Sequence, residues 1–306
     1  MPDPARSSGP GLGWAAHAGF VAPARDRAEL WRLPLGLLVV AATGLALNAV
    51  LAGALSAVSP DFWRGEIATA RAPGQTPASL LVLLTTFAFF ALGTGLAVVM
   101  VHRRPAPTLL GPLRAAVSQF GAVLAMLLLV ALAIAVLPPW RSGLEPEPNL
   151  PFGTWAALLP LSLTALLIQV GAEEVLFRGY LQQQLAARFD SPWIWIGVPS
   201  LLFAAGHYVP SEAGENALLI AVWAAVFGVL MADLTARAGT LGPAIAVHMA
   251  NNVVAILLIS VTDGMSGLAL YVSAGAADPE LVRAWLPVDF ATMVVSWLAA
   301  RLALRR

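Results

Sequence analysis

Long runs of apolar residues, separated by short polar segments, dominate the chain. A helix needs about 20 such residues to cross about 30 Å of hydrocarbon, and runs of about this length recur throughout the sequence. We place eight of them at residues 33 to 58, 79 to 101, 117 to 138, 154 to 178, 192 to 208, 217 to 236, 241 to 261 and 286 to 304. Irregular backbone cannot face lipid and the alternation of barrel strands is absent, so the pattern predicts an all-α, polytopic membrane bundle of about eight transmembrane helices.

Composition supports this class and narrows the chemistry. The 306 residues are 59% hydrophobic and 11% charged, whereas a soluble domain has about 25% charged residues. Six tryptophans lie near the predicted span ends, where an amphipathic ring prefers to sit: Trp31, Trp63, Trp140, Trp155, Trp193 and Trp285. The absence of cysteine excludes disulfides, thiolate nucleophiles and cysteine-ligated metals.

The arginines predict the orientation in the membrane. With the N-terminus inside, thirteen of the 17 basic residues, all arginine, fall in inside segments; the outside ones are Arg64, Arg71, Arg141 and Arg283. The positive-inside rule then places both termini in the cytoplasm, in a multi-pass protein of the cell (inner) membrane. Residues 1 to 28 are rich in Pro, Gly, Ala and Ser and are predicted to form a mobile tail. Residues 29 to 306 form a single transmembrane domain in this interpretation.

Polar side chains within the predicted spans are few and fall in three segments. A carboxylate in or near hydrocarbon costs several kcal/mol, so its presence there indicates a function. The segment "GAEEVLFRGY" carries Glu173, Glu174 and Arg178; "LLFAAGHYVP" carries Phe203 and His207; "GPAIAVHMANN" carries His248, Asn251 and Asn252. Every histidine within a predicted span lies in one of these segments.

Helical spacing sorts the first segment by face. Glu174 and Arg178 stand four residues apart, in the order that favours an ion pair. Glu173 lies about 100° around the helix and is left without that partner. Its own face, four residues before it and seven after it, carries Gln169 and Tyr180. Glu173 is therefore the carboxylate that we expect to be free for chemistry.

The last segment also presents two polar groups in one direction. His248 and Asn252 are four residues apart on a helix that Gly242 and Pro243 open, and proline is tolerated in a first turn. Two polar side chains on one face of an apolar helix indicate a shared target.

These three motifs, in this order and each in an apolar span, resemble those of the CPBP intramembrane protease family. The family includes the type II CAAX prenyl endopeptidases and bacterial relatives linked to bacteriocin processing, self-immunity and removal of C-terminal sorting tags. The resemblance covers about residues 155 to 262. It implies hydrolysis of a peptide bond within or beside the bilayer, in a membrane-associated protein or peptide, and no nucleic-acid partner. Which of these substrate types applies stays open.

The resemblance also assigns roles to the residues. It implies that Glu173 and His207 activate a water molecule, while His248 and Asn252 stabilise the oxyanion. A glutamate in a low-dielectric site is a usable general base near neutral pH, which agrees independently with this assignment. Around these four, Arg178 is expected to hold Glu174 and so fix the helix, with Phe203 beside them.

A metal is the less favoured alternative. The family is often classed with metalloproteases. A hydrolytic zinc site needs three protein ligands, and Glu173, His207 and His248 would supply that number. Such a site would use the base and an oxyanion donor as ligands, and the amide of Asn252 is a poor zinc ligand. We therefore expect no metal and no other cofactor.

Other interpretations remain open. The glutamate and the two histidines could relay protons in a proton-coupled transporter, although such folds show corresponding polar segments in two halves and this chain does not. A non-catalytic immunity or scaffold protein could keep the same fold. Glu174 with Arg178 could be an interfacial ion pair, His207 could lie at the outer interface, and His248 with Asn252 could join helices.

Idealised spans separate the groups that should meet. They place the glutamates near the cytoplasmic face and His207 toward the outer one. We therefore expect the fourth helix to be tilted and to continue past residue 178 through "YLQQQLAARF", which brings Glu173 deeper into the membrane. Asp190 and Ser191 before Pro192 are typical of the start of the next helix.

Overall fold

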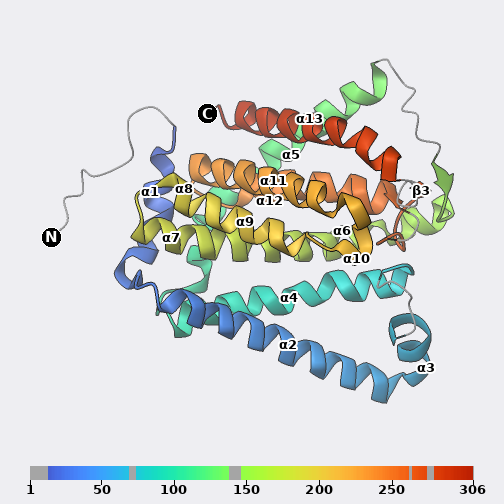
Figure 1. Ribbon diagram of the computed structural model, residues 1–306, viewed down its shortest axis with the longest axis horizontal. Helices are drawn as coiled ribbons and strands as arrows, with labels where there is room; N and C mark the ends of the chain where they lie inside the picture. Colours follow the sequence, from blue (N-terminus) through green and yellow to red (C-terminus); the bar gives the residue numbers. More distant parts are fainter. Residues whose placement is uncertain (1–12, 69–73, 138–145, 262–263, 274–278, 306) are drawn as a thin grey trace.

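The computed structural model describes residues 13–68, 74–137, 146–261, 264–273 and 279–305. Its helices lie side by side along the long axis of the molecule (Figure 1). The α-helices are α1 Ala15–Val21, α2 Arg32–Val58, α3 Pro60–Phe62, α4 Pro77–Met100, α5 Leu113–Val136, α6 Phe152–Glu174, α7 Gln183–Arg188, α8 Pro192–Trp195, α9 Gly197–Gly206, α10 Pro210–Ala213, α11 Ala217–Ala238, α12 Gly242–Asn252 and α13 Pro279–Leu304. Short 3₁₀ helices are η1 Ala22–Arg27, η3 Ala106–Leu109 and η5 Gly214–Asn216. Three segments are π-helical: η2 Trp63–Ala68, η4 Val175–Gln182 and η6 Val253–Leu258.

Eight apolar helical segments correspond to the eight predicted spans. Within the described residues, six are long and apolar enough to cross a membrane: Arg32–Val58, Pro77–Met100, Ala106–Val136, Phe152–Arg188, Gly214–Ala238 and Arg283–Leu304. The other two, Pro192–Gly206 and Gly242–Leu258, are shorter. The prediction of an all-α, polytopic membrane protein is confirmed, with the fifth and seventh spans shorter than the rest.

The fourth span is longer than the apolar run that predicted it. Helices α6, η4 and α7 follow one another without a break and form one run of 37 residues, Phe152–Arg188. The expected continuation past residue 178 is therefore present. The seventh span is corrected in the other direction, because its last three residues leave the helix and form the strand β2, Ile259–Val261.

A three-stranded sheet lies at the end of the bundle where α6 begins (Figure 1). Its strands, in the order β1-β3-β2, are β1 Glu147–Pro148, β3 Tyr271–Ser273 and β2, with β1 antiparallel and β2 parallel to β3. The side-chain amide of Asn149 donates to the carbonyls of Ser266 and Ala269 and joins the loop before β3 to the start of α6. The sheet thus fixes the segment that follows η6.

The main hydrophobic core lies around α11. It brings together Val123 of α5, Phe203 of α9, Phe227 of α11, Val247 of α12 and Met293 of α13, each at most 4% exposed. Helix α2 packs on α4, and α4 packs in turn on α6 (Figure 1). The helices that carry the three motifs therefore occupy the centre of the bundle.

A close backbone approach sets the position of α12. A Cβ atom at Gly242 would lie 2.0 Å from the carbonyl oxygen of Ala116 on α5, so only glycine allows this contact. Pro243 follows in the first turn, where its missing N–H leaves no helical hydrogen bond unmade. The start of α12 is thus held against α5, and this fixes the depth at which His248 lies.

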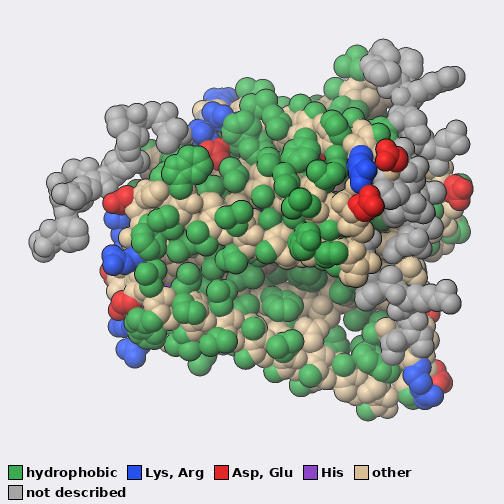
Figure 2. Space-filling view, viewed as in Figure 1, with side chains coloured by type: hydrophobic (Ala, Val, Ile, Leu, Met, Phe, Trp, Pro, Cys, Tyr) green, Lys and Arg blue, Asp and Glu red, His purple; other side chains and the backbone are tan. Residues whose placement is uncertain are grey.

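Charged and apolar side chains are separated on the surface. Figure 2 shows charged side chains gathered at the two ends of the long axis and hydrophobic side chains over the region between them. Apolar residues of the long helices that are more than half exposed include Leu45, Leu128, Leu132 and Leu302. Large apolar side chains facing outward around a bundle are typical of a surface in contact with lipid.

Residues 13 to 28 differ from the predicted mobile tail. Helix α1 and η1 pack against the bundle, with Phe20 and Val21 each 2% exposed. The indole of Trp14 donates to Asp233 Oδ1 at 2.9 Å. His17 lies against Trp195 with ring centroids 4.3 Å apart, and burial, with a smaller effect of Arg25, lowers its pKa to about 4. The first twelve residues lie outside the described part of the chain.

The first and last helices of the described chain, α1 and α13, meet at the same end of the bundle. Asp233 Oδ2 accepts from the indole of Trp297 on α13 at 2.9 Å, while Oδ1 accepts from Trp14. We call this end, where Arg32, Arg188 and Arg237 lie, the arginine-rich end. Because Trp14 and Trp297 lie at the same end of the bundle, the chain between them crosses the membrane an even number of times.

We expect the arginine-rich end to face the cytoplasm. Two of the arginines assigned to the outside, Arg71 and Arg141, lie outside the described residues, as do residues 138 to 145 of the predicted external loop. Alkaline phosphatase fused after Arg306 should be inactive, and the same enzyme inserted beside Glu147 should be active, because it folds only outside the cytoplasm. An active C-terminal fusion would reverse the orientation.

Candidate active site

Three of the polar residues singled out by sequence stand where α-helix changes to π-helix. Glu173 and Glu174 are the last two residues of α6, directly before η4, and Asn252 is the last residue of α12, directly before η6. Hydrogen bonds in a π-helix join residues five apart, and such turns often mark functional sites. The wider turn also moves Tyr180 off the face of Glu173. Its hydroxyl instead donates to the ring of His102 at 3.0 Å, near the arginine-rich end.

Glu174 is the buried centre of the cluster. Its side chain is 0% exposed, and its Oε1 accepts from Arg178 Nη1 at 2.9 Å and from His248 Nδ1 at 2.8 Å. Arg178 also donates through Nη2 to the carbonyl of Gly228 on α11, at 3.3 Å. The ion pair predicted from the four-residue spacing is therefore present. It lies inside the bundle and not at an interface with water or lipid headgroups.

Glu173 differs from its neighbour in exposure. Its side chain is 15% exposed, and its Oε2 lies 3.4 Å from His248 Nε2. The ring of His248 thus stands between the two carboxylates, with one nitrogen toward each. Of the two glutamates, only Glu173 is open to a molecule that enters from outside the bundle.

Asn252 is held by its neighbours on both sides. Its Nδ2 donates to Gln169 Oε1 at 3.1 Å, and its Oδ1 accepts from Asn251 Nδ2 at 3.2 Å. Gln169 lies one turn before Glu173 on α6, so this contact joins α12 to α6 beside the glutamates. His248, Asn252 and Glu173 are thereby brought to one place.

His207 stands next to this place but not in direct contact with it. Its Nδ1 donates to the carbonyl of Phe203 at 2.8 Å, which leaves Nε2 available. The ring of Phe203 lies near both histidines, with centroids 4.3 Å from His207 and 6.1 Å from His248. Among the described residues, His207 makes no hydrogen bond or ion pair with Glu173, so any cooperation between them needs a bridging molecule.

Aromatic rings line the other side of His248. Phe227 meets its ring edge-on at 4.9 Å, and Trp223 stacks on Phe227 at 5.4 Å. The guanidinium of Arg178 lies 5.0 Å from the Phe203 ring. Sequence reasoning missed Phe227, Trp223 and the Gly228 carbonyl, because apolar rings and backbone groups of a membrane helix carry no polar signal; only the four-residue spacing of the two rings pointed to a common face.

The residues proposed as an alternative zinc site do not form one here. In the described part of the chain, no three His, Asp or Glu side chains are grouped so that they could hold a metal ion. Both ring nitrogens of His248 face carboxylates, and Nδ1 of His207 is turned to the carbonyl of Phe203. Glu173, His207 and His248 therefore do not fit a zinc ion in this arrangement.

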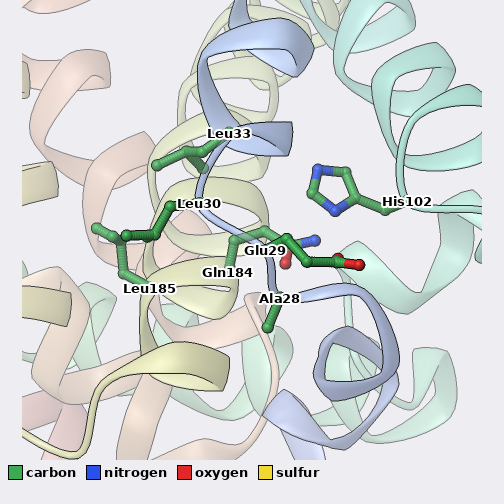
Figure 3. Close-up of a pocket in the computed structure, with 7 residues that line it drawn as sticks. All are labelled: Ala28, Glu29, Leu30, Leu33, His102, Gln184 and Leu185. Atoms are coloured by element: carbon green, nitrogen blue, oxygen red, sulfur yellow. The ribbon is translucent and has the colours of Figure 1, made fainter.

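A small cavity lies at the arginine-rich end, away from these residues. Figure 3 shows it between Glu29, His102 and Gln184. Its volume is about 10 Å³, room for about one water molecule. The side-chain amide of Gln184 is buried, and neither its nitrogen nor its oxygen has a hydrogen-bond partner among the described residues. The cavity is too small to hold a peptide.

Comparisons with known proteins identify the same part of the chain. Residues 155–254 match the family described as Type II CAAX prenyl endopeptidase Rce1-like. The uncharacterized protein YyaK of Bacillus subtilis (strain 168) is 26% identical over 186 residues. These cover 59% of this chain and 61% of that relative. No solved structure matches the chain.

The matched residues include all three motifs. The resemblance to the type II CAAX prenyl endopeptidases is thereby confirmed over residues 155–254. The family that this segment matches is described as one of endopeptidases.

Proposed function

We propose that this protein is a glutamate-dependent intramembrane endopeptidase in which Glu173 is the general base. The observation that carries the proposal is the contrast between the two adjacent glutamates. Glu174 is fully buried and bonded to Arg178 and His248, whereas Glu173 is partly exposed and lies 3.4 Å from His248 Nε2. One carboxylate is thus fixed by the fold and the other is free to meet a substrate.

The contacts of His248 support a base at Glu173. His248 Nδ1 donates to Glu174 Oε1, a carboxylate oxygen, which only accepts. Its other nitrogen, Nε2, lies 3.4 Å from Glu173 Oε2. Among the described residues, Glu173 Oε2 has no hydrogen-bond partner, whereas Glu174 Oε1 accepts from both Arg178 and His248. Glu173 is therefore the carboxylate of the pair that is left to accept a proton.

The reaction follows from these positions. Glu173 takes a proton from a water molecule, and the water oxygen attacks the carbonyl carbon of the substrate. The carbonyl oxygen becomes an oxyanion, which the second N–H of Asn252 stabilises together with His248. The carbon–nitrogen bond then breaks, and Glu173 returns the proton to the leaving amine. Positioned acid–base groups contribute about 10²–10⁴-fold to such reactions.

His207 has a supporting role in this scheme. Its Nε2, at the end of α9, is the group that could share a water molecule with Glu173. The carbonyl of Phe203, 2.8 Å from Nδ1, fixes the position of the ring. Catalytic hydrogen bonds are often long before a substrate binds, so a separation that a water bridges agrees with the role.

The substrate is expected to be a membrane-associated protein or peptide. CAAX-type, bacteriocin-type and C-terminal sorting-tag processing are the three candidate activities. Comparison of the membrane proteomes of a deletion strain, a Glu173→Ala strain and the wild type tests the proposal. We expect the same precursor to accumulate uncleaved in both mutant strains. The absence of any precursor common to the two would contradict an endopeptidase function.

Activity is predicted to be independent of metal ions. Within the described residues, Glu173, His207 and His248 are not grouped as a metal site, and the scheme above uses Glu173 as a base and His248 beside the oxyanion. Purified protein treated exhaustively with phenanthroline should retain its activity on the peptide that spans the cleavage site of the precursor. Stoichiometric zinc in the purified protein, with activity lost on its removal and regained on its return, would overturn this prediction.

A further inference from the structure

Gln169 is a buried polar residue in an apolar stretch of α6. It is 7% exposed, while its neighbours Leu166 and Val170 are 0% exposed. A buried amide costs free energy unless its polar atoms are hydrogen-bonded. The bond that Gln169 makes is to Asn252, whose Nδ2 donates to its Oε1. This position therefore connects α6 to the residue that the proposed reaction uses as an oxyanion donor.

The contacts fix which way the amide of Asn252 is turned. Gln169 Oε1 accepts from Nδ2 at 3.1 Å, and Asn251 Nδ2 donates to Oδ1 at 3.2 Å. A side-chain amide nitrogen carries two hydrogens, so one N–H of Asn252 points to Gln169 and the other stays available. A half-turn of the amide would exchange its nitrogen and oxygen. It would break both contacts at once.

The orientation decides the chemistry of the site. An N–H aimed at the carbonyl oxygen of a substrate stabilises the developing negative charge, whereas an amide oxygen in the same place repels it. Without the acceptor on Gln169, the contact with Asn251 at 3.2 Å would be the one left to hold the amide. Gln169 is thus the group on α6 that selects the productive orientation.

We propose that Gln169 is a positioning residue for the reaction, which acts by orienting the amide of Asn252 toward the substrate oxygen. The inference rests on the proposed function, and it adds a residue outside the three motifs. It also explains why a glutamine stands where a leucine would pack at lower cost.

The test compares Gln169→Leu with a matched control, Gln184→Leu. Both replace a buried glutamine of the same continuous helix, but the amide of Gln184 has no hydrogen-bond partner among the described residues. The assay uses the synthetic peptide that spans the cleavage site of the precursor, presented in detergent micelles. We expect Gln169→Leu to lower kcat about tenfold or more with KM changed less than about twofold, and Gln184→Leu to leave both unchanged.

A double-mutant cycle separates positioning from packing. Asn252→Ala should lower kcat about 10²–10³-fold, the usual effect of removing an oxyanion donor. If Gln169 acts through Asn252, adding Gln169→Leu to Asn252→Ala should cause no further loss. Losses that multiply, or an unchanged kcat in Gln169→Leu, would overturn the inference.

A spectroscopic measurement keeps the inference separate from the proposed function. The chain has five asparagines, so protein labelled with ¹⁵N-asparagine gives few side-chain amide signals, and the Asn252→Ala variant identifies that of Asn252. Gln169→Leu should shift this signal, and Gln184→Leu should not. If Asn252→Ala cleaves normally, the proposed oxyanion role fails whatever the spectrum shows. If Asn252→Ala is inactive and the signal does not move in Gln169→Leu, only the positioning role fails.

Discussion

Replacing Glu173 with glutamine is expected to abolish cleavage while leaving the fold intact. Glutamine keeps the size of the side chain but cannot take a proton from water, so kcat should fall by at least about 100-fold. The partly exposed side chain makes one ionic contact, with His248 Nε2 at 3.4 Å, and its loss should change the free energy of unfolding by less than about 1 kcal/mol. The measurements are peptide cleavage and thermal unfolding of the purified variant in detergent.

A matched control is Glu66→Gln on η2, at the opposite end of the bundle from the arginine-rich end. Glu66 accepts a hydrogen bond at 2.6 Å from Thr76, the residue before α4, and this contact lies away from the motifs. This variant should therefore cleave at the wild-type rate. Normal cleavage by Glu173→Gln would remove Glu173 as the base. Loss of cleavage together with loss of the folded protein would show that Glu173 is needed for structure.

Glu174→Gln is expected to act on stability first. Arg178 is 1% exposed, and the change removes the negative charge 2.9 Å from its guanidinium. Loss of one partner of a buried ion pair costs about 3–5 kcal/mol, because the remaining charge is left in a low-dielectric surrounding. The retained amide oxygen can still accept one hydrogen bond, so we expect the free energy of unfolding to fall by about 3 kcal/mol, the lower end of this range. The midpoint of thermal unfolding in detergent measures it.

Two further variants test whether the loss of stability comes from the buried charge of Arg178. Glu215→Gln breaks an ion pair with Arg283 at 2.8 Å in which the glutamate side chain is 78% exposed, and it should cost less than about 1 kcal/mol. Glu174→Gln combined with Arg178→Met removes both buried charges and should recover part of the lost stability. Wild-type stability of Glu174→Gln with complete loss of cleavage would instead give Glu174 a direct part in the chemistry.

The positions of the helices follow closely from the sequence. The first span begins at Arg32 where residue 33 was predicted, and the second ends at Met100 where residue 101 was predicted. Hydrophobic length determines these boundaries, because each residue within the bilayer must be apolar or paired. The ion pair of Glu174 with Arg178 was predictable for a similar reason, since spacing along one helix decides it.

Contacts between helices were less accessible to sequence reasoning. The sequence predicts that His248 and Glu174 belong to one site, but not that the ring lies between the two glutamates. That arrangement depends on the depth of α12, which the approach of Gly242 to Ala116 sets, and on the π-helical turns after Glu174 and Asn252. Helical periodicity assumes 3.6 residues per turn, so the predicted face that joined Glu173 to Tyr180 was wrong once the turn widened.

The packing of the N-terminal segment was missed for a different reason. Its composition is typical of a flexible tail, yet Trp14 and His17 find partners on helices more than 170 residues away. A high content of Pro, Gly, Ala and Ser is a property of the whole segment. Docking depends on single contacts, here the hydrogen bond from Trp14 to the buried carboxylate of Asp233.

That docking also dictates an order of events during biosynthesis. Trp14 leaves the ribosome long before its partner Asp233, which lies 219 residues later, and before Trp297, which shares the same carboxylate. The segment must therefore wait, undocked, until α11 and α13 have been inserted in the membrane. Its arrival joins the first and last parts of the chain at one residue, so a protease-accessible N-terminal segment would mark chains whose assembly is incomplete.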